Sequence, residues 1–275
     1  MGKGSRRVEL APLYVLHHRP WRDTSRMLDV FTRDHGRLML FARGVRGPKS
    51  RAASALQPFR LLLGSWSTSG EAGQLSQVEV AASRDSAGDL EARPAATGVA
   101  DEGGAAAGEP QPLPAAALLS GWYLNELVLK LTVRNDPQPQ VFDLYHDTLR
   151  RLRTQSSVAA ALRRFERQLL ELLGYGVEFR HDARAGEALQ PGASYHFHPE
   201  LGFIEVSGEA AAAAAAFRGR DLLAVADDDY DDPAVLETAR RVLRTALDRA
   251  LEGRELNTRA VARSVARRQR DRETS

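Results

Sequence analysis

Short runs of alternating apolar and polar residues fill the first part of the chain. They lie in residues 11–19, 21–36, 36–44, 56–66 and 73–82, with turn residues between them. Alternation with a period of two predicts half-buried β-strands, and turn residues between such runs predict antiparallel connections. Five short strands predict a small barrel over residues 1–82. The OB-fold is the five-stranded barrel most associated with oligonucleotides, and an SH3-like barrel fits the strand count nearly as well.

The alternation stops in residues 83–114, which are rich in Ala, Gly, Pro and acidic residues and have almost no large apolar side chains. Such a segment cannot bury enough surface to offset the entropy lost on ordering. We therefore predict a flexible linker or a long disordered loop, which separates the barrel from a second domain over residues 115–275.

Apolar residues then recur with a helical period. Helices are predicted at residues 115–134, 141–152, 156–176, 210–225, 231–251 and 256–270. The first is apolar nearly all round, which is typical of a central buried helix. Ser156 or Ser157 can cap the start of the third, and Gly174 can end it. These helices predict a bundle.

Residues 177–206 interrupt the helices with an irregular pattern and two strand-like pieces, 194–198 and 202–206. The fold class that follows is α+β. An N-terminal five-stranded OB-fold barrel precedes a mainly α-helical domain that contains a small irregular β insert.

Composition adds to this picture. The chain has 275 residues, is 43% hydrophobic and 27% charged, and contains no cysteine. The absence of cysteine excludes disulfides, a thiol nucleophile and cysteine-liganded zinc. No apolar segment follows the initial Met, and the alanine run 210–217 is too short to span a bilayer. We expect a soluble cytoplasmic protein with no membrane partner.

Charge is distributed unevenly. Residues 1–80 carry 13 Lys and Arg against 6 Asp and Glu, a net of +7, while residues 81–114 carry 2 against 6, a net of −4. The remainder carries 23 against 24, a net of −1. A basic module on a near-neutral body indicates a polyanionic partner such as nucleic acid. The alternative is a basic surface that only aids solubility.

The loop 43–51, "RGVRGPKSR", concentrates this charge in Arg43, Arg46, Lys49 and Arg51. It is not a nucleotide-binding P-loop, because Pro48 breaks the required spacing and removes an amide donor. We interpret it as a basic finger that grips nucleic-acid phosphates, with a solvated turn as the alternative.

Aromatic residues for base stacking accompany the charge. Trp21 lies between Arg19 and Arg22 in a predicted loop, whereas Phe31 and Phe41 are predicted in the barrel core. The tail helix carries arginines along one face, which indicates a solvated helix or a second nucleic-acid contact. The predicted DNA-binding residues are Arg19, Trp21, Arg22, Arg26, Arg33, Arg37, Arg43, Arg46, Lys49, Arg51, Arg259 and Arg263.

Catalytic and metal sites find little support. His181, His196 and His198 lack a matching carboxylate pattern, and ordinary surface histidines are the better interpretation. The acidic run 227–232 could hold a divalent metal, but Asp232 followed by Pro233 is typical of a helix start. No Ser/His/Asp signature is visible. We predict no catalytic residue, no metal and no cofactor, and therefore no enzyme.

Several motifs together resemble the RecO family of bacterial recombination mediators. They are residues 15–47 ("VLHHRPWRDTSRMLDVFTRDHGRLMLFARGVRG"), "ALQPF", "GWYLNELV", "ALRRFE", "LLGYGVEF" and "GFI", in the family's order and spacing. The resemblance covers nearly the whole chain outside residues 83–112. Many members carry a four-cysteine zinc site in the third region, so this chain resembles the zinc-free branch.

The resemblance implies binding of single- and double-stranded DNA and annealing of complementary strands without ATP. It also implies work with RecR to load RecA onto DNA coated by single-strand-binding protein (SSB), at the nucleoid during repair. The family docks on the SSB C-terminal tail, which ends in acidic residues, an apolar ring and a free carboxylate. The "LRRFE" helix matches the family position for that tail, which implies roles for Arg163, Arg164 and Arg167.

Two alternatives belong to other functional classes. One is an OB-fold adaptor that acts mainly through protein contacts and binds DNA weakly. The other, a metal-dependent nuclease that uses the acidic run 227–232, has less support because that run also explains a helix start.

Overall fold

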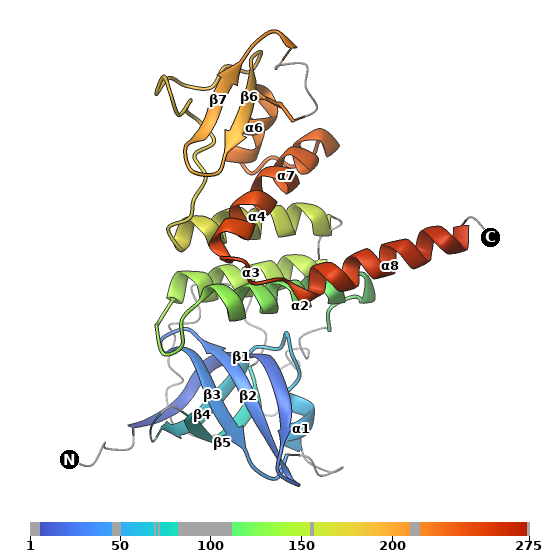
Figure 1. Cartoon of the computed structure of the whole chain (residues 1–275). Helices are drawn as coiled ribbons and strands as arrows, with labels where there is room; N and C mark the ends of the chain where they lie inside the picture. Colours follow the sequence, from blue (N-terminus) through green and yellow to red (C-terminus); the bar gives the residue numbers. More distant parts are fainter. Residues whose placement is uncertain are drawn as a thin grey trace, which may run out of the picture. The chain divides into compact units, whose positions relative to one another are not determined.

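The computed structural model describes residues 6–45, 51–68, 70, 72–81, 112–154, 157–209 and 215–273. The chain forms two compact units (Figure 1). The first comprises residues 1–153 together with 258–275, and the second comprises residues 154–257. The predicted linker falls mostly on residues 82–111, which lie outside the described residues, and the predicted domain boundaries stay predictions.

The first unit begins with a closed five-stranded barrel. Its strands are β1 (Arg6–Trp21), β2 (Ser25–Thr32), β3 (Gly36–Ala42), β4 (Leu62–Thr68) and β5 (Ala72–Val80). They are arranged in the order β1-β2-β3-β5-β4, and pairing of β1 with β4 closes the barrel. A short helix that the sequence pattern did not indicate, α1 (Arg51–Ala55), connects β3 to β4. The predicted OB-fold barrel is confirmed.

Alternation along the strands fills the barrel core. Val30 and Leu40 point inward and are fully buried, as predicted. The prediction that Phe31 and Phe41 lie in the same core is wrong. Each follows an inward-pointing residue, so the two-residue period turns its ring to the outer surface of the barrel.

Two helices, α2 (Ala115–Leu131) and α3 (Pro139–Thr154), lie over the barrel (Figure 1). Phe31 packs against them, with its ring centroid 5.5 Å from that of Phe142. The Tyr145 hydroxyl donates to Asn125 Oδ1 at 2.6 Å, and Asn125 Nδ2 donates to the carbonyl of Leu16 at 2.8 Å. Aromatic packing and satisfied buried polar groups therefore fix both helices to β1 and β2.

Close packing between α2 and the α1–β4 loop depends on a glycine. A Cβ atom on Gly121 would lie 2.7 Å from Leu113 Cδ1 and 2.9 Å from Phe59 Cε1. The ring of Phe59 also packs edge-on against Trp122, with centroids 5.1 Å apart. The prediction that α2 is buried all round is wrong on one side, because Leu118 is 42% and Trp122 40% exposed.

The C-terminal helix α8 (Asn257–Glu273) completes the first unit and confirms the predicted tail helix. Its first turn is attached to α2, since the backbone N–H and the hydroxyl of Thr258 both donate to Glu126, at 2.9 and 2.6 Å. The side chains of Val261, Arg263 and Val265, farther along α8, are exposed.

The second unit combines helices with a small sheet. Helices α4 (Val158–Leu172) and α7 (Pro233–Ala250) pack together, and α6 (Gly219–Ala226) packs on α7. The sheet has the order β7-β6-β8, with β6 (Ser194–His198), β7 (Gly202–Val206) and β8 (Phe217–Arg218). The predicted strands 194–198 and 202–206 are confirmed. The predicted helix over 210–225 is wrong at Phe217 and Arg218, which pair with β6 instead.

Helix starts in this unit follow the predicted chemistry. Ser157 accepts a hydrogen bond from the backbone N–H of Ala160 at 3.2 Å, and Asp232 accepts one from that of Ala234 at 2.8 Å. Pro233 occupies the first turn of α7. Both caps satisfy amide donors that the helices leave unpaired, so the interpretation of Asp232 as a helix start is confirmed.

Candidate nucleic-acid interface

An aromatic pair lies on the outer face of the barrel, where β1 ends. The ring centroids of Trp21 and Phe41 are 5.3 Å apart, and Trp21 is 41% exposed. Beside them, Nε and Nη2 of Arg19 lie 3.1 and 2.9 Å from the sulfur of Met27. Because Phe41 supports Trp21 from below in the strand register, the exposed indole is held as a flat surface on which a base could stack.

Cations surround this pair. Arg19, Arg22 and Arg43 are exposed at the ends of β1 and β3. Nη1 of Arg26 is buried and has no hydrogen-bond partner within the described part of the chain. Burial first, and then the charges of Arg26 and His17, lower the pKa of His18. These cations give the outer end of the barrel a positive field that favours an anionic ligand.

Two of the predicted DNA-binding arginines are instead engaged within the unit. Arg33 forms a two-point contact with Asp143 of α3, at 3.0 and 3.1 Å. Arg37 donates to the hydroxyl and carbonyl of Thr132 at 3.0 and 2.7 Å. Burial, followed by the nearby charge of Arg134, lowers the pKa of Arg37. Both guanidinium groups therefore connect the barrel to the helices above it.

The structure places the other predicted contacts as follows. Arg46 and Lys49 lie outside the described residues, and Arg51 begins α1 although its side chain is not described. Arg259 is half-buried in the first turn of α8, and Arg263 is exposed one turn later. The exposed members at the barrel end come together, whereas those on α8 form a separate basic surface.

The arginines of the "LRRFE" helix have internal partners in the second unit. Arg163 Nη2 lies 2.8 Å from an oxygen of Glu166, whose side chain is only 2% exposed. Arg167 contacts both oxygens of Asp228, at 3.1 and 2.8 Å, and Arg164 donates to the Asp228 carbonyl at 2.9 Å. The predicted pairing of Arg163 with Glu166 exists, but on a buried carboxylate instead of a solvated face.

Asp228 is the residue that sequence reasoning missed here. Gln168 and the Tyr230 hydroxyl also donate to its carboxylate, each at 3.2 Å. Burial alone would raise the pKa of Asp228, but the hydrogen bond and charge of Arg167 lower it. The acidic run 227–232 carried the signal, yet the sequence alone did not indicate which carboxylate meets Arg167.

The histidines of the second unit lie apart in their contacts. His196 is half-buried on β6, His198 is exposed at its end, and His181 lies 3.5 Å from Glu178. Within the described ranges, no three His, Cys, Asp or Glu side chains come together as a possible metal site. In the same ranges, no helix combines the length and apolar character that crossing a membrane requires.

Comparison with known proteins covers both units. Residues 10–84 match the family model "Recombination protein O N terminal", and residues 115–260 match "Recombination protein O C terminal". The chain is 36% identical over 262 residues to the DNA repair protein RecO of Azoarcus sp. (strain BH72), covering 94% of this chain and 97% of that protein. It is 40% identical over 266 residues to DNA repair protein RecO of Alkalilimnicola ehrlichii, covering 95% and 93%. The chain belongs to the RecO family of DNA repair proteins.

Proposed function

We propose that this protein is a non-enzymatic recombination mediator. It binds single- and double-stranded DNA, anneals complementary strands without ATP, and works with RecR to load RecA onto SSB-coated DNA. It acts in the cytoplasm, at the nucleoid during repair, because its substrate is chromosomal DNA. Membership in the RecO family supports this proposal in general, and the barrel surface supports it in particular.

The observation that carries the proposal is the exposed Trp21, held by Phe41 and flanked by arginines at one end of the barrel. Single-stranded DNA binds where aromatic rings for its bases lie beside cations for its phosphates. Arg19, Arg22 and Arg43 supply such cations, and loop 43–51 supplies more charge in sequence. Neutralised phosphates repel less, so two complementary strands held this way can anneal without a nucleotide cofactor.

The partner site is proposed on α4. An acidic tail peptide with a terminal carboxylate suits a guanidinium fork, which binds a carboxylate at two points. Arg163, Arg164 and Arg167 are the candidate residues, and all three already contact carboxylate or carbonyl oxygens of this chain. This chemistry supports the SSB tail as the ligand, with RecR and RecA as further partners.

One observation favours the adaptor alternative. Arg33 and Arg37 are engaged by Asp143 and Thr132, so part of the barrel's charge serves structure instead of DNA. Annealing separates the two functions. The mediator should accelerate pairing of complementary fluorescent oligonucleotides without ATP or Mg²⁺, and a Trp21→Ala variant should do so more slowly. An adaptor should leave the spontaneous annealing rate unchanged while still binding its protein partners.

A further inference from the structure

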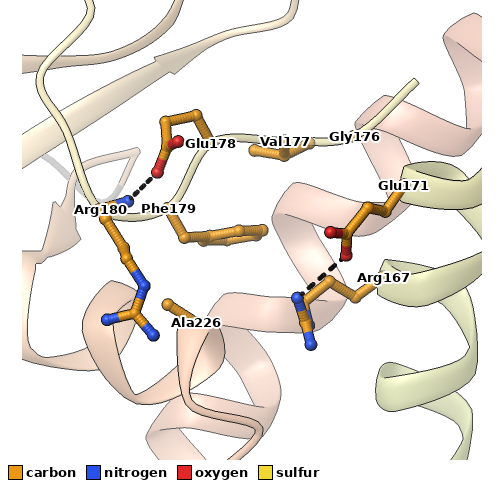
Figure 2. A pocket seen from close by; sticks show the side chains of 8 residues that line it. All are labelled: Arg167, Glu171, Gly176, Val177, Glu178, Phe179, Arg180 and Ala226. Carbon is orange, nitrogen blue, oxygen red and sulfur yellow. Dashed lines mark hydrogen bonds and ion pairs between the residues drawn. The ribbon is translucent and has the colours of Figure 1, made fainter. Parts of the chain in front are cut away.

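A small cavity opens beside the arginine helix of the second unit. It has a volume of about 350 Å³ and lies between the end of α4 and the segment that follows it (Figure 2). Phe179, Val177 and Ala226 form its apolar lining, and Arg167 and Arg180 stand on opposite sides of the Phe179 ring. This volume is at the small end for ligand pockets, which suits one ring with one charged group.

Three carboxylates contact the two arginines, and they differ in exposure. Glu171 lies 3.5 Å from Nη1 of Arg167 and is 66% exposed. Asp227 lies 2.6 Å from Nη2 of Arg180 and is 60% exposed. Exposed pairs of this kind contribute little free energy, so an incoming anion can replace either carboxylate at small cost.

Asp228 is held differently. Its side chain is 20% exposed, and it accepts hydrogen bonds from two nitrogens of Arg167 and from Gln168 and Tyr230. These contacts use Nε and Nη2 of Arg167, which leaves Nη1 on the side of Glu171 and the cavity. Asp228 therefore fixes the orientation of Arg167 and is not itself easily displaced.

We propose that this cavity binds the aromatic residue and terminal carboxylate of an acidic peptide, with Glu171 and Asp227 as internal competitors and Asp228 as the residue that positions Arg167. The proposal rests on the acidic-tail partner proposed above and names its binding site. The peptide's ring lies against Val177, Phe179 and Ala226. Its carboxylate takes the places of Glu171 and Asp227 between Arg167 and Arg180.

Binding of a labelled probe tests this proposal through changes of opposite sign. The probe is a fluorescein-labelled peptide of six aspartates followed by a C-terminal phenylalanine with a free carboxylate, titrated at one salt concentration. Glu171→Gln and Asp227→Asn should each tighten binding by about two- to fivefold, because each removes a weak competitor. Asp228→Asn and Arg180→Gln should each weaken binding by about tenfold or more, because a positioned charge-assisted contact is lost.

Asp231→Asn is the matched control, since it removes the same charge from an exposed side chain of the same loop that does not line the cavity. Equal tightening in Asp231→Asn and Asp227→Asn would reduce the effect to net charge and overturn the proposed site. The same peptide with an amidated C-terminus should bind weakly to every variant. Melting temperatures identify any variant that fails to fold, and Glu171→Gln and Asp227→Asn alter exposed residues that should leave folding intact.

The outcomes separate this inference from the proposed partner. If the wild-type protein binds the peptide and Glu171→Gln and Asp227→Asn match it, the partner stands and the cavity is the wrong site. If neither the wild type nor any variant binds the peptide, the acidic-tail partner itself is wrong and the inference fails with it. Changes in single-stranded DNA affinity that parallel the peptide series would assign the cavity to nucleic acid and also overturn the proposal.

Discussion

The hydroxyl of Tyr14 lies 2.6 Å from Nδ1 of His146, in a buried contact between β1 and α3. Tyr14 is 1% exposed and His146 7% exposed. Burial, opposed in part by the charge of Asp147, lowers the pKa of His146 below its ordinary value, so the imidazole is neutral in the folded protein. A neutral imidazole and a neutral phenol can form this hydrogen bond without an uncompensated buried charge.

This contact predicts a loss of stability in mild acid. Below the ordinary histidine pKa of about 6.5, the unfolded chain binds a proton that the folded protein excludes until its lower pKa is reached. The free energy of unfolding should therefore fall as the pH decreases through that window, by up to about 1.4 kcal/mol per pH unit. His146→Gln should flatten the dependence in denaturant unfolding followed from pH 5 to 7.5. His198→Gln, at an exposed site, should leave it unchanged, and an unaltered slope in His146→Gln would contradict the prediction.

Asp182 should matter to the second unit in a similar way but with acid on the other side of its titration. Its Oδ1 accepts from the backbone N–H groups of Arg184 and Ala185 at 2.8 and 2.6 Å, and its Oδ2 from that of Glu205 at 2.7 Å. The hydrogen bond from Ala185 is the main cause that lowers the pKa of Asp182. Stability from this carboxylate is present above the ordinary aspartate pKa and is lost as the pH falls through the lower folded value.

We expect Asp182→Asn to destabilise the second unit by about 1–3 kcal/mol at neutral pH, because an amide oxygen replaces only part of the acceptor capacity. Glu187→Gln is the control, since it changes an exposed side chain in the same loop. Thermal and denaturant unfolding measure both. A change in Asp182→Asn no larger than that of the control would show that the loop is held by other contacts.

Local chemistry explains what could be predicted from the sequence. The barrel strands, the Ser157 and Asp232 caps and the β6–β7 hairpin follow from residues close together in the chain. Partners far apart in sequence could not be predicted the same way. Arg33 meets Asp143 across 110 positions and Arg167 meets Asp228 across 61, and residue type alone did not distinguish these pairings from contacts with DNA or a peptide.

The faces of the helices and strands were predictable only in part. Phe41 was assigned to the core because it is large and apolar, yet strand alternation places it beneath Trp21 on the outside. Trp122 was assigned to a buried helix for the same reason, although 40% of it is exposed beside Phe59. Apolar character predicts a contact, but the side of the element decides whether the partner is the core, a neighbouring ring or a ligand.

Stacking on Trp21 makes a direct prediction for DNA. Trp21→Ala should weaken binding to a short single-stranded oligonucleotide by about 1–3 kcal/mol, the range for one base on an aromatic ring. Its salt dependence should not change, because no phosphate contact is lost. Leu201→Ala removes a comparably exposed apolar side chain from the second unit and serves as the control. Equal affinities for Trp21→Ala and wild type in a fluorescence titration would remove the stacking role.

Phosphate contacts should appear in the salt dependence instead. If about five phosphates are neutralised on a single strand, the log–log slope of affinity against salt should be roughly −3 to −4. Neutralising Arg43, Arg46, Lys49 and Arg51 together should flatten this slope. An unchanged slope in the quadruple variant would leave the basic loop as a solvated turn.

Arg33→Gln and Arg37→Gln provide the contrast to the loop variant. Their guanidinium groups contact Asp143 and Thr132, so the structure predicts lower stability of the first unit. The cost should be about 1–3 kcal/mol for each lost charge-assisted contact, with a nearly unaltered salt slope. Measuring both quantities on the same preparations distinguishes charge used for folding from charge used for DNA.

Arg163 has two possible roles that mutation can separate. If it binds the carboxylate of the acidic tail, Arg163→Ala should weaken the tail peptide by about 2–5 kcal/mol while DNA binding stays near wild type. The structure adds a second consequence. Glu166 is 1% exposed and pairs with Arg163 at 2.8 Å, so the same variant removes one partner of a buried carboxylate and should lower the melting temperature.

Glu166→Gln resolves the ambiguity because it removes the buried charge without touching the arginine. Where Arg163 serves the peptide, Arg163→Ala and the Arg163→Ala/Glu166→Gln double variant should both bind poorly, and Glu166→Gln alone should bind at least as well as wild type. Where Arg163 serves only Glu166, the double variant should regain stability and all four proteins should bind the peptide within about 0.5 kcal/mol of one another. Peptide titrations and melting curves at a single salt concentration distinguish these patterns, and lysine at position 163 should rescue stability better than affinity, because it supplies a charge without the two-point fork.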